Sequence, residues 1–169
     1  MNFVLCGMMA CGKTTVGEAL SKALGWELVD TDAVIADRYG AIKTLFERLG
    51  EAEFRRLEKA IVQEAAARDG IVIATGGGVL TQEDNRAALK QNGTIVYLRA
   101  TLETLCERLE GDETRPLLQG DGWQKTLEAL LKARKEQYAA AADIVTDVDG
   151  KTPQQIVEEL MKTIGREGI

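Results

Sequence analysis

A glycine-rich segment followed by a lysine and a threonine is the part of the chain whose residue types indicate chemistry most clearly. Residues 7–14 read GMMACGKT, which fits the spacing G-x-x-x-x-G-K-[ST]. Glycines let such a backbone curl until several N–H groups point at the same phosphate oxygens. Lys13 would reach the β and γ phosphates of a nucleotide, and the Thr14 hydroxyl would ligate Mg²⁺. The pattern predicts a phosphate-binding loop, against the alternative of a glycine-rich turn that only caps a helix.

Two aspartates, Asp30 and Asp32, follow the short apolar run Glu27-Leu28-Val29. A carboxylate at a strand end beside a phosphate-binding loop can hold Mg²⁺ through water. Aspartate is also a good N-cap, so either residue could instead begin the next helix. We expect a metal or substrate role for the pair.

Three consecutive glycines, Gly76, Gly77 and Gly78, follow the apolar run at residues 71–74. Three glycines in a row lose much backbone entropy on folding, so the sequence needs a reason for them. One reason is the close approach of backbone N–H groups to an oxyanion, and the other is a tight turn.

The chain has 21 Lys and Arg residues against 27 Asp and Glu residues, so its net charge is −6. An acidic chain is a poor match for nucleic acid or for an anionic membrane surface. An anionic ligand must therefore be held by a local cluster of cations. The candidates are Arg55, Arg56, Arg115 and Arg134, although a single arginine is more often a solvated surface charge than a ligand.

Histidine and cysteine usage narrows the chemistry further. The chain of 169 residues has no histidine, which excludes Ser-His-Asp and Cys-His catalysis and leaves acid–base work to carboxylates or lysines. Its three widely spaced cysteines argue against a disulfide framework. Cys11 lies inside the glycine-rich loop, where a helix N-terminus and Lys13 could lower its thiol pKa; the alternative is a small buried thiol.

Apolar runs alternate with helical periodicity along the chain. Strands are expected over residues 3–6, 27–29, 71–74, 94–98 and 143–146. Helices are expected over 13–24, 33–68 with breaks near Gly40 and Gly50, 82–91, 101–110, 123–142 and from Pro153 to Gly165. This alternation predicts an α/β fold, a three-layer αβα domain over 1–169 with a five-stranded parallel sheet.

Ligands bind parallel sheets at the carboxyl ends of the strands. The loops at 7–12, 30–32 and 75–78 follow strands and are therefore expected on one rim. No stretch approaches the ~18 apolar residues of a membrane span. We expect a cytoplasmic protein, monomeric, with no nucleic acid or membrane partner.

With these residues in place, the whole chain resembles the shikimate kinase family of the nucleoside-monophosphate-kinase-like P-loop group. The resemblance depends on a series of motifs in order: GMMACGKT, Asp30-Thr31-Asp32, the run GEAEFRRLE at 50–58, the three glycines, Arg115-Pro116-Leu117-Leu118, and Arg134 four residues before Tyr138. It implies a P-loop kinase fold with a mobile lid over 110–122, an acceptor-binding segment over 32–61, and ATP-dependent phosphorylation of the shikimate 3-hydroxyl with Mg²⁺.

The resemblance also implies residue roles. Lys13, Asp32 and Arg115 would be catalytic, with Asp32 orienting the attacking hydroxyl. Shikimate would be held by Asp32, Arg55, Gly76, Gly77, Gly78 and Arg134. Mg²⁺ would be held by Thr14, with Asp30 behind it. ATP would be held by Gly7, Ala10, Cys11, Gly12, Lys13, Thr14, Thr15, Arg108, Arg115 and Pro153, with adenine between Arg108 and the turn that ends in Pro153.

One residue departs from the family pattern: Ala10 stands where the loop usually has a third glycine. If this position needs a positive φ, alanine costs about 1–2 kcal/mol.

Two other functions share parts of the pattern. A kinase for another acceptor, such as gluconate or a nucleotide, shares the loop and lid, and a non-catalytic nucleotide-binding switch shares only the loop.

Overall fold

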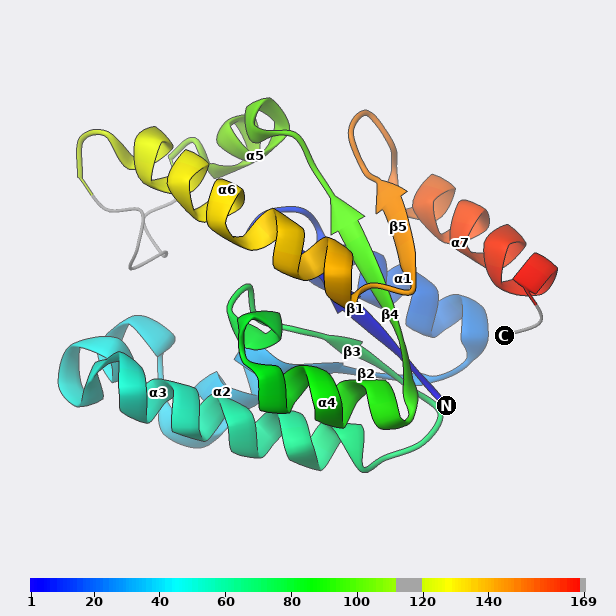
Figure 1. The fold of residues 1–169 in the computed structure, drawn as a ribbon, viewed down its shortest axis with the longest axis horizontal. Helices are drawn as coiled ribbons and strands as arrows, with labels where there is room; N and C mark the ends of the chain where they lie inside the picture. The colour runs from blue at the N-terminus through cyan, green and yellow to red at the C-terminus, as the bar shows by residue number, and fades with distance from the viewer. Residues whose placement is uncertain (112–119, 168–169) are drawn as a thin grey trace.

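A five-stranded parallel sheet forms the middle layer of the computed structural model, which describes residues 1–111 and 120–167. Its strand order is β2-β3-β1-β4-β5 (Figure 1). The strands are β1 (Asn2–Cys6), β2 (Glu27–Asp30), β3 (Ile71–Ala74), β4 (Gly93–Arg99) and β5 (Ile144–Asp147). The predicted fold class is confirmed, and each strand lies within one residue of its expected position at either end.

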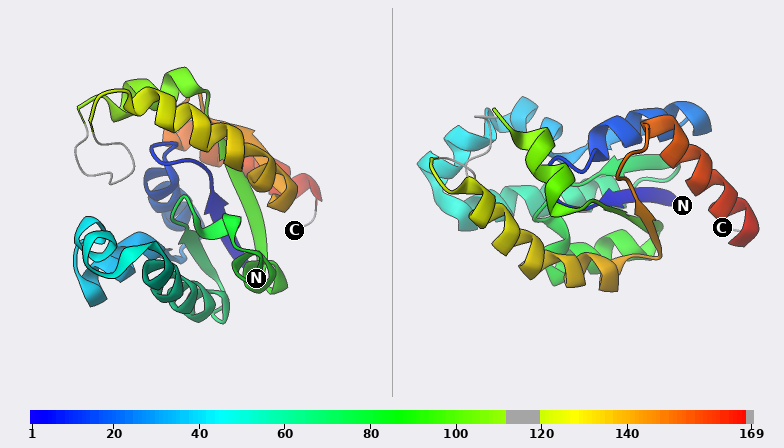
Figure 2. Two further views of the ribbon diagram at one scale, coloured as in Figure 1. Left: turned by 60° about the vertical axis from the view of Figure 1, so that its left-hand side comes forward. Right: turned by 90° about the horizontal axis from the view of Figure 1, so that it is seen from above.

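Helices cover both faces of the sheet (Figure 2). On one face α1 (Lys13–Leu24) packs against α7 (Pro153–Glu167), and on the other α4 (Glu83–Gln91) and α6 (Trp123–Ala141) contact β4. The long helix α3 (Ile42–Ala66) lies beside α4, and α2 (Thr31–Tyr39) packs on α3. Helix α5 (Leu102–Leu109) packs on α6, and a short 3₁₀ turn, η1 (Val79–Thr81), which the sequence did not predict, precedes α4.

The central strands are buried on both faces, which explains their continuous apolar runs. Every residue of β1 and β3 is buried, and Leu5, Val72 and Ile73 are fully inaccessible. Val4 pairs with Ile73 on one side and with Ile95 on the other, so β1 is the middle strand of the sheet. These strands form the main core with the inner faces of α1, α4, α6 and α7.

A second, smaller hydrophobic cluster lies apart from the main core. It consists of Ile35 of α2 with Leu45, Phe54 and Ile61 of α3. Helix α3 is kinked inside this region at Gly50, where φ is 79° and ψ is 170°. The kink confirms the break expected near Gly50 and gives the two halves of α3 different directions.

The strand order brings three loops to one rim. Strand β1 lies beside β3, and β3 lies beside β2, so the segments that follow them all leave the sheet at neighbouring positions. The rim predicted from the sequence is therefore confirmed. The glycine-rich loop after β1 stands between the segments after β3 and β4.

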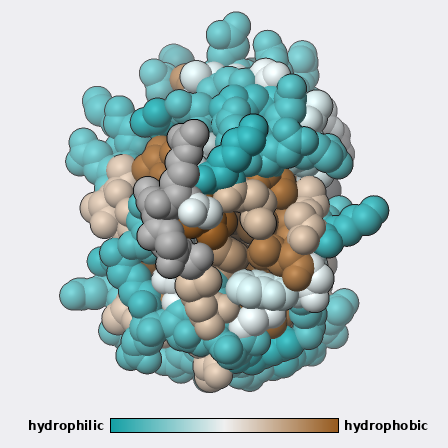
Figure 3. All heavy atoms as spheres, turned by 90° about the vertical axis from the view of Figure 1, so that its right-hand side faces the viewer, coloured by the Kyte–Doolittle hydropathy of each residue, from teal (hydrophilic) through white to brown (hydrophobic). Residues whose placement is uncertain are grey.

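The side on which the two termini lie shows hydrophilic side chains around a more hydrophobic middle (Figure 3). Within residues 1–111 and 120–167, no helix combines the length and apolar character needed to cross a membrane. The three cysteines are all free, as expected from their spacing. Arg115 and most of the predicted lid lie outside the described residues.

Candidate functional site

The glycine-rich loop joins β1 to α1 and takes two turns that require glycine. Gly7 has φ 143°, and a Cβ there would lie 2.6 Å from the Leu98 carbonyl oxygen and 2.8 Å from the Cys11 sulfur. Gly12 has φ 100° and is the N-cap of α1. The loop therefore ends at a helix N-terminus whose first N–H groups and positive dipole end are arranged to receive an anion.

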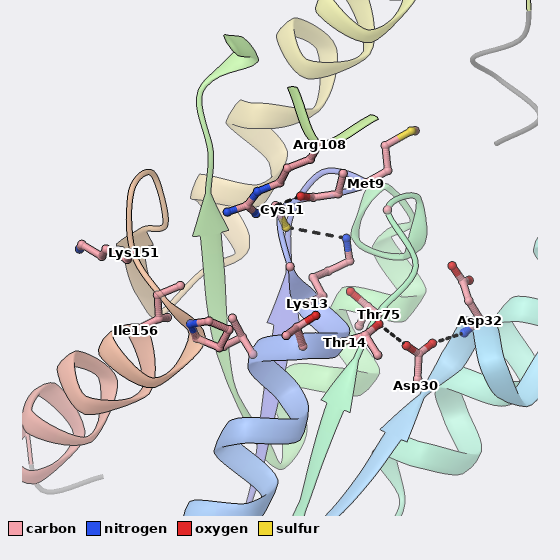
Figure 4. Close-up of a pocket in the computed structure, with 16 residues that line it drawn as sticks. Met9, Cys11, Lys13, Thr14, Asp30, Asp32, Thr75, Arg108, Lys151 and Ile156 are labelled. Atoms are coloured by element: carbon pink, nitrogen blue, oxygen red, sulfur yellow. Dashed lines mark hydrogen bonds between the residues drawn. The ribbon is translucent and has the colours of Figure 1, made fainter. Parts of the chain in front are cut away.

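Lys13 is the first residue of α1, and its ammonium lies against this loop (Figure 4). Its Nζ donates to the carbonyl oxygens of Gly7 and Met8, each at 2.9 Å, and lies 3.9 Å from the Cys11 sulfur. The ammonium is thus held against the loop that surrounds it, where a phosphate bound by the loop would meet it. Cys11 is 1% exposed, which favours the small buried thiol over a reactive one.

Ala10 adopts a left-handed conformation with φ 63°, the only positive φ at a non-glycine residue within the described part of the chain. The position therefore does need a positive φ, so alanine carries the backbone strain that glycine would avoid. The carbonyl oxygen of Ala10 accepts a hydrogen bond from Nη1 of Arg108 at 3.1 Å. This contact holds the guanidinium of Arg108 over the loop.

Asp30 has two structural roles at the end of β2. Its Oδ1 accepts hydrogen bonds from the backbone N–H groups of Asp32 and Ala33, so Asp30 is the N-cap of α2. Its Oδ2 accepts a hydrogen bond from the Thr14 hydroxyl at 2.5 Å. The capping role weighed from the sequence is confirmed, and the same carboxylate fixes the hydroxyl at the start of α1.

A cavity of about 460 Å³ opens over this loop. Six residues expected to bind ATP line it from the loop and α1, namely Ala10, Cys11, Gly12, Lys13, Thr14 and Thr15. Arg108 and Pro153 line it from α5 and α7, Asp30 lines it from the end of β2, and Asp32 lines it from the first turn of α2. With Thr75 and Gly77 after β3, the cavity brings together residues from five separate segments of the chain.

A smaller cavity of about 90 Å³ adjoins the first. Arg55, Arg134 and the three glycines line it, together with Phe46 and Phe54. Asp32, Gly77 and Met9 line both cavities. A ligand in the smaller cavity therefore lies next to a ligand above the glycine-rich loop.

The glycines at 76–78 are required by the side chains that pack on them. A Cβ on Gly76 would lie 2.6 Å from Oδ1 of Asp32, and a Cβ on Gly78 would overlap the Arg55 guanidinium. None of the three has a positive φ. The N–H of Gly76 donates to the Thr31 hydroxyl, and among residues 1–111 and 120–167 the N–H groups of Gly77 and Gly78 donate no hydrogen bond.

Glu58 is the principal site residue to which the sequence analysis gave no role. Its side chain is 1% exposed, lines the smaller cavity, and accepts a hydrogen bond from Arg55 at 2.7 Å. Burial raises the pKa of Glu58, while Arg55 and Arg134 act to lower it and Asp32 acts to raise it. The i, i+3 spacing from Arg55 was the signal that could have found Glu58, since such residues share a helical face.

Other residues were missed because only the fold brings them to the cavities. Thr75, Lys151 and Ile156 line the larger one, and Ile42 lines the smaller one. Arg56, a candidate cation, instead faces solvent with 67% of its side chain exposed and pairs with Glu53. Its role is the solvated surface charge that is common for arginine.

The parallel sheet, the loop between β1 and α1, and the paired cavities define a phosphotransferase of the P-loop kinase class. The phosphate-binding loop leads into the larger cavity, and a second cavity lined by Arg55 and Arg134 stands beside it. A binding module that only recognised a nucleotide would not need the second cavity.

Comparison with known proteins identifies the family. The family model for shikimate kinase matches residues 9–165. The chain is 42% identical over 164 residues to a shikimate kinase of Hahella chejuensis, covering 96% of this chain and 85% of the relative. It is also 42% identical over 160 residues to one of Geobacter sulfurreducens, covering 94% and 88%. The chain belongs to the shikimate kinase family.

Comparison with solved structures leads to the same family. The shikimate kinase of Acinetobacter baumannii in complex with shikimate is 36% identical, has a TM-score of 0.95 and is matched over 98% of this chain and 93% of that one. A gluconokinase of Sinorhizobium meliloti has a TM-score of 0.65 at 18% identity, which shows a shared fold only. The expectation of a shikimate kinase is confirmed over the gluconate, nucleotide and switch alternatives.

Proposed function

We propose that the larger cavity binds ATP and the smaller cavity binds shikimate, and that the protein transfers the γ-phosphoryl group from ATP to shikimate. The shikimate 3-hydroxyl oxygen forms the new bond to phosphorus, the bond to the β-phosphate oxygen breaks, and ADP and the hydroxyl proton leave. The supporting observation is that Asp32 and Gly77 line both cavities, so the acceptor and the terminal phosphate can meet there. The product is shikimate 3-phosphate, an intermediate of aromatic amino acid biosynthesis.

The phosphate-binding loop supplies most of the charge stabilisation. Phosphoryl transfer has a loose transition state with charge spread over the phosphoryl oxygens, so positioning and neutralisation dominate the catalysis. The backbone N–H groups of the loop and the ammonium of Lys13 surround the position of the β and γ phosphates. Gly7 and Gly12 permit the curvature that aims these groups inward.

Mg²⁺ fits the oxygen donors next to the loop. The Thr14 hydroxyl, held 2.5 Å from Asp30, is a hard oxygen ligand with a carboxylate behind it. Within the described residues no group of three or more acidic, cysteine or histidine ligands could hold a metal. The ion would therefore complete its shell with phosphate oxygens and water, as Mg²⁺ commonly does in kinases. When bound, it neutralises charge on the β and γ phosphates.

Asp32 would orient the attacking hydroxyl at the junction of the cavities. It is the carboxylate shared by both, and it would accept the hydroxyl proton as the transfer proceeds. A loose transition state makes little demand for a strong base, so orientation is the larger part of this role.

Arg55 and Arg134 would hold the shikimate carboxylate, with Gly77 contributing its backbone. A guanidinium pairs with a carboxylate by two parallel hydrogen bonds, which also fixes orientation. Glu58 keeps the Arg55 side chain directed along the cavity wall. The local cluster of arginines is what allows a chain of net charge −6 to bind an anion.

The remaining roles belong to the same proposal. Arg108 and Pro153 would flank adenine, since both line the larger cavity. Arg115 would reach the phosphates from a lid over 110–122, and residues 32–61 would form the acceptor-binding segment of one domain spanning 1–169. We also propose that the protein works as a monomer in the cytoplasm, with no nucleic acid or membrane partner.

The test is a coupled assay of ADP release with Mg-ATP and shikimate, with gluconate and AMP as control acceptors. We expect release only with shikimate. Asp32→Ala should reduce kcat at least tenfold, whereas Asp32→Asn should retain more activity because an amide can still orient a hydroxyl. Asp37→Asn, an exposed aspartate on the same helix, is the matched control and should leave the rate unchanged. ADP release with gluconate or AMP in place of shikimate would refute the proposal.

A further inference from the structure

Tyr138 of α6 touches two of the loops that form the site. Its side chain is 1% exposed, and its hydroxyl donates a hydrogen bond to the Gly77 carbonyl oxygen at 2.5 Å. The same hydroxyl lies 3.8 Å from the sulfur of Met8 in the phosphate-binding loop. One buried phenol therefore stands between the segment after β1 and the segment after β3.

The ring of Tyr138 is fixed by its surroundings. Helix α6 runs alongside β4 (Figure 1), and the ring packs on that of Tyr97 in β4, with centroids 5.2 Å apart and planes tilted by 41°. Arg134 lies one helical turn earlier on the same face, because residues four apart are neighbours on a helix. A Cβ on Gly77 would lie 3.4 Å from Nη1 of Arg134 and 3.8 Å from the Tyr138 hydroxyl.

The glycine loop needs a contact of this kind from outside. Glycine has the greatest backbone freedom of any residue, so three in a row do not hold one conformation by themselves. Gly76 is held by the Thr31 hydroxyl, and the contact on Gly77 comes from Tyr138. Because the C=O and N–H of a planar trans peptide point in opposite directions, fixing the Gly77 carbonyl also fixes the Gly78 N–H on the far side of that plane.

The hydroxyl remains a donor throughout the usual working range. Burial raises the pKa of Tyr138 well above its ordinary value, although Arg134 acts to lower it. The phenol is therefore protonated wherever the enzyme is assayed near neutral pH. In the described part of the chain, the oxygen that accepts from this hydroxyl is the carbonyl of Gly77.

We propose that Tyr138 is a positioning residue for the acceptor: its hydroxyl fixes the Gly77–Gly78 peptide so that the glycine loop presents its N–H groups to the shikimate carboxylate beside Arg134. The proposal rests on the assignment of the smaller cavity to shikimate. It goes beyond that assignment because it gives the recognition of the acceptor to a side chain that does not line either cavity.

The test compares Tyr138→Phe with Tyr97→Phe. Both changes remove one phenolic oxygen from a buried side chain and keep the ring, and within the described residues the Tyr97 hydroxyl makes no hydrogen bond of its own. For each variant and the parent, kcat and the two KM values are measured by ADP release, shikimate binding by calorimetry, and Tm by thermal unfolding. We expect Tyr138→Phe to raise the KM and Kd for shikimate roughly five- to tenfold, because a buried carbonyl loses its partner. The KM for ATP should stay within about twofold, and Tyr97→Phe should leave both KM values unchanged.

Three results would overturn the inference. Kinetic constants within twofold of the parent would do so whatever the change in Tm, since the hydroxyl would then be only structural. A lower kcat at unchanged KM and Kd would indicate a smaller active fraction. An equal rise of the shikimate KM in both variants would indicate a general loss of packing. Failure of the parent itself to release ADP with shikimate would instead refute the proposed function, so the two failures are distinguishable.

Discussion

Replacing Ala10 by glycine should stabilise the protein, although such a change usually destabilises. Ala10 has φ 63°, where the Cβ of an L-residue crowds the following carbonyl oxygen. Glycine has no Cβ and adopts this conformation without cost. The Arg108 contact is made to the backbone oxygen of residue 10, so the substitution leaves it in place.

The size of the effect follows from two opposing contributions. Relief of the left-handed conformation contributes about 1–2 kcal/mol. The greater freedom of glycine in the unfolded chain subtracts about 0.4–1 kcal/mol. The difference runs from about 0 to about 1.6 kcal/mol, and its midpoint of about 0.8 kcal/mol raises Tm by about 2–3 °C for a chain of 169 residues.

The assay is thermal unfolding, by calorimetry or circular dichroism, of the parent, Ala10→Gly and Ala87→Gly. Ala87 is exposed within α4, so the same chemical change there should cost about 1 kcal/mol and lower Tm by about 2–4 °C. The two variants should therefore shift Tm in opposite directions. We also expect the KM for ATP of Ala10→Gly to stay within about threefold of the parent.

A fall in Tm of similar size in both variants would refute the reasoning. It would mean that the loop relieves the strain at Ala10 elsewhere, or that the alanine methyl makes contacts worth more than its conformational cost. If Tm is unchanged in Ala10→Gly and lowered in Ala87→Gly, the free energy gained by removing the backbone strain at residue 10 lies near its lower limit of about 1 kcal/mol.

Three further predictions concern the site. Lys13→Met should lower kcat by roughly 10²–10³ in steady-state assays, because it removes a cation at the developing phosphoryl charge, while the exposed Lys43→Met should not. Gly78→Ala should raise the shikimate KM roughly tenfold and lower Tm, since the new methyl displaces the Arg55 guanidinium from its place beside the buried Glu58; a lowered Tm at normal KM would contradict the binding role. Burial raises the pKa of Glu58 above its ordinary 4.5, so the folded parent loses stability as pH rises above about 4.5 and Glu58 ionises. Glu58→Gln lacks this ionisation, so its Tm should rise relative to that of the parent as pH increases. A Tm difference that does not change with pH would contradict this prediction.

The secondary structure could be predicted because its signals are local. The continuous apolar runs of β1 and β3 indicated strands buried on both faces, and the spacing of the glycines marked the ends of helices. The phosphate-binding loop could be predicted for the same reason, since its motif lies within eight consecutive residues. The rim followed from the rule that parallel strands end at one edge of a sheet.

What could not be predicted depends on residues far apart in the chain. The second partner of Asp30 is Thr14, sixteen residues earlier, and no local pattern indicates that a helix cap also binds a hydroxyl. The backbone angle of Ala10 is set by how the loop closes. The i, i+3 spacing places Glu58 on the same helical face as Arg55, but it does not tell whether that face is exposed or forms a cavity wall, because this depends on the neighbouring segments.

The separate cluster of Ile35, Leu45, Phe54 and Ile61 has an evolutionary consequence. The part of the chain proposed to recognise the acceptor encloses its own buried side chains, apart from the layer that anchors the phosphate-binding loop. Substitutions within this cluster therefore disturb the nucleotide half less than substitutions in the main core would. A single ancestral scaffold could in this way diversify toward new alcohols while retaining one phosphoryl donor.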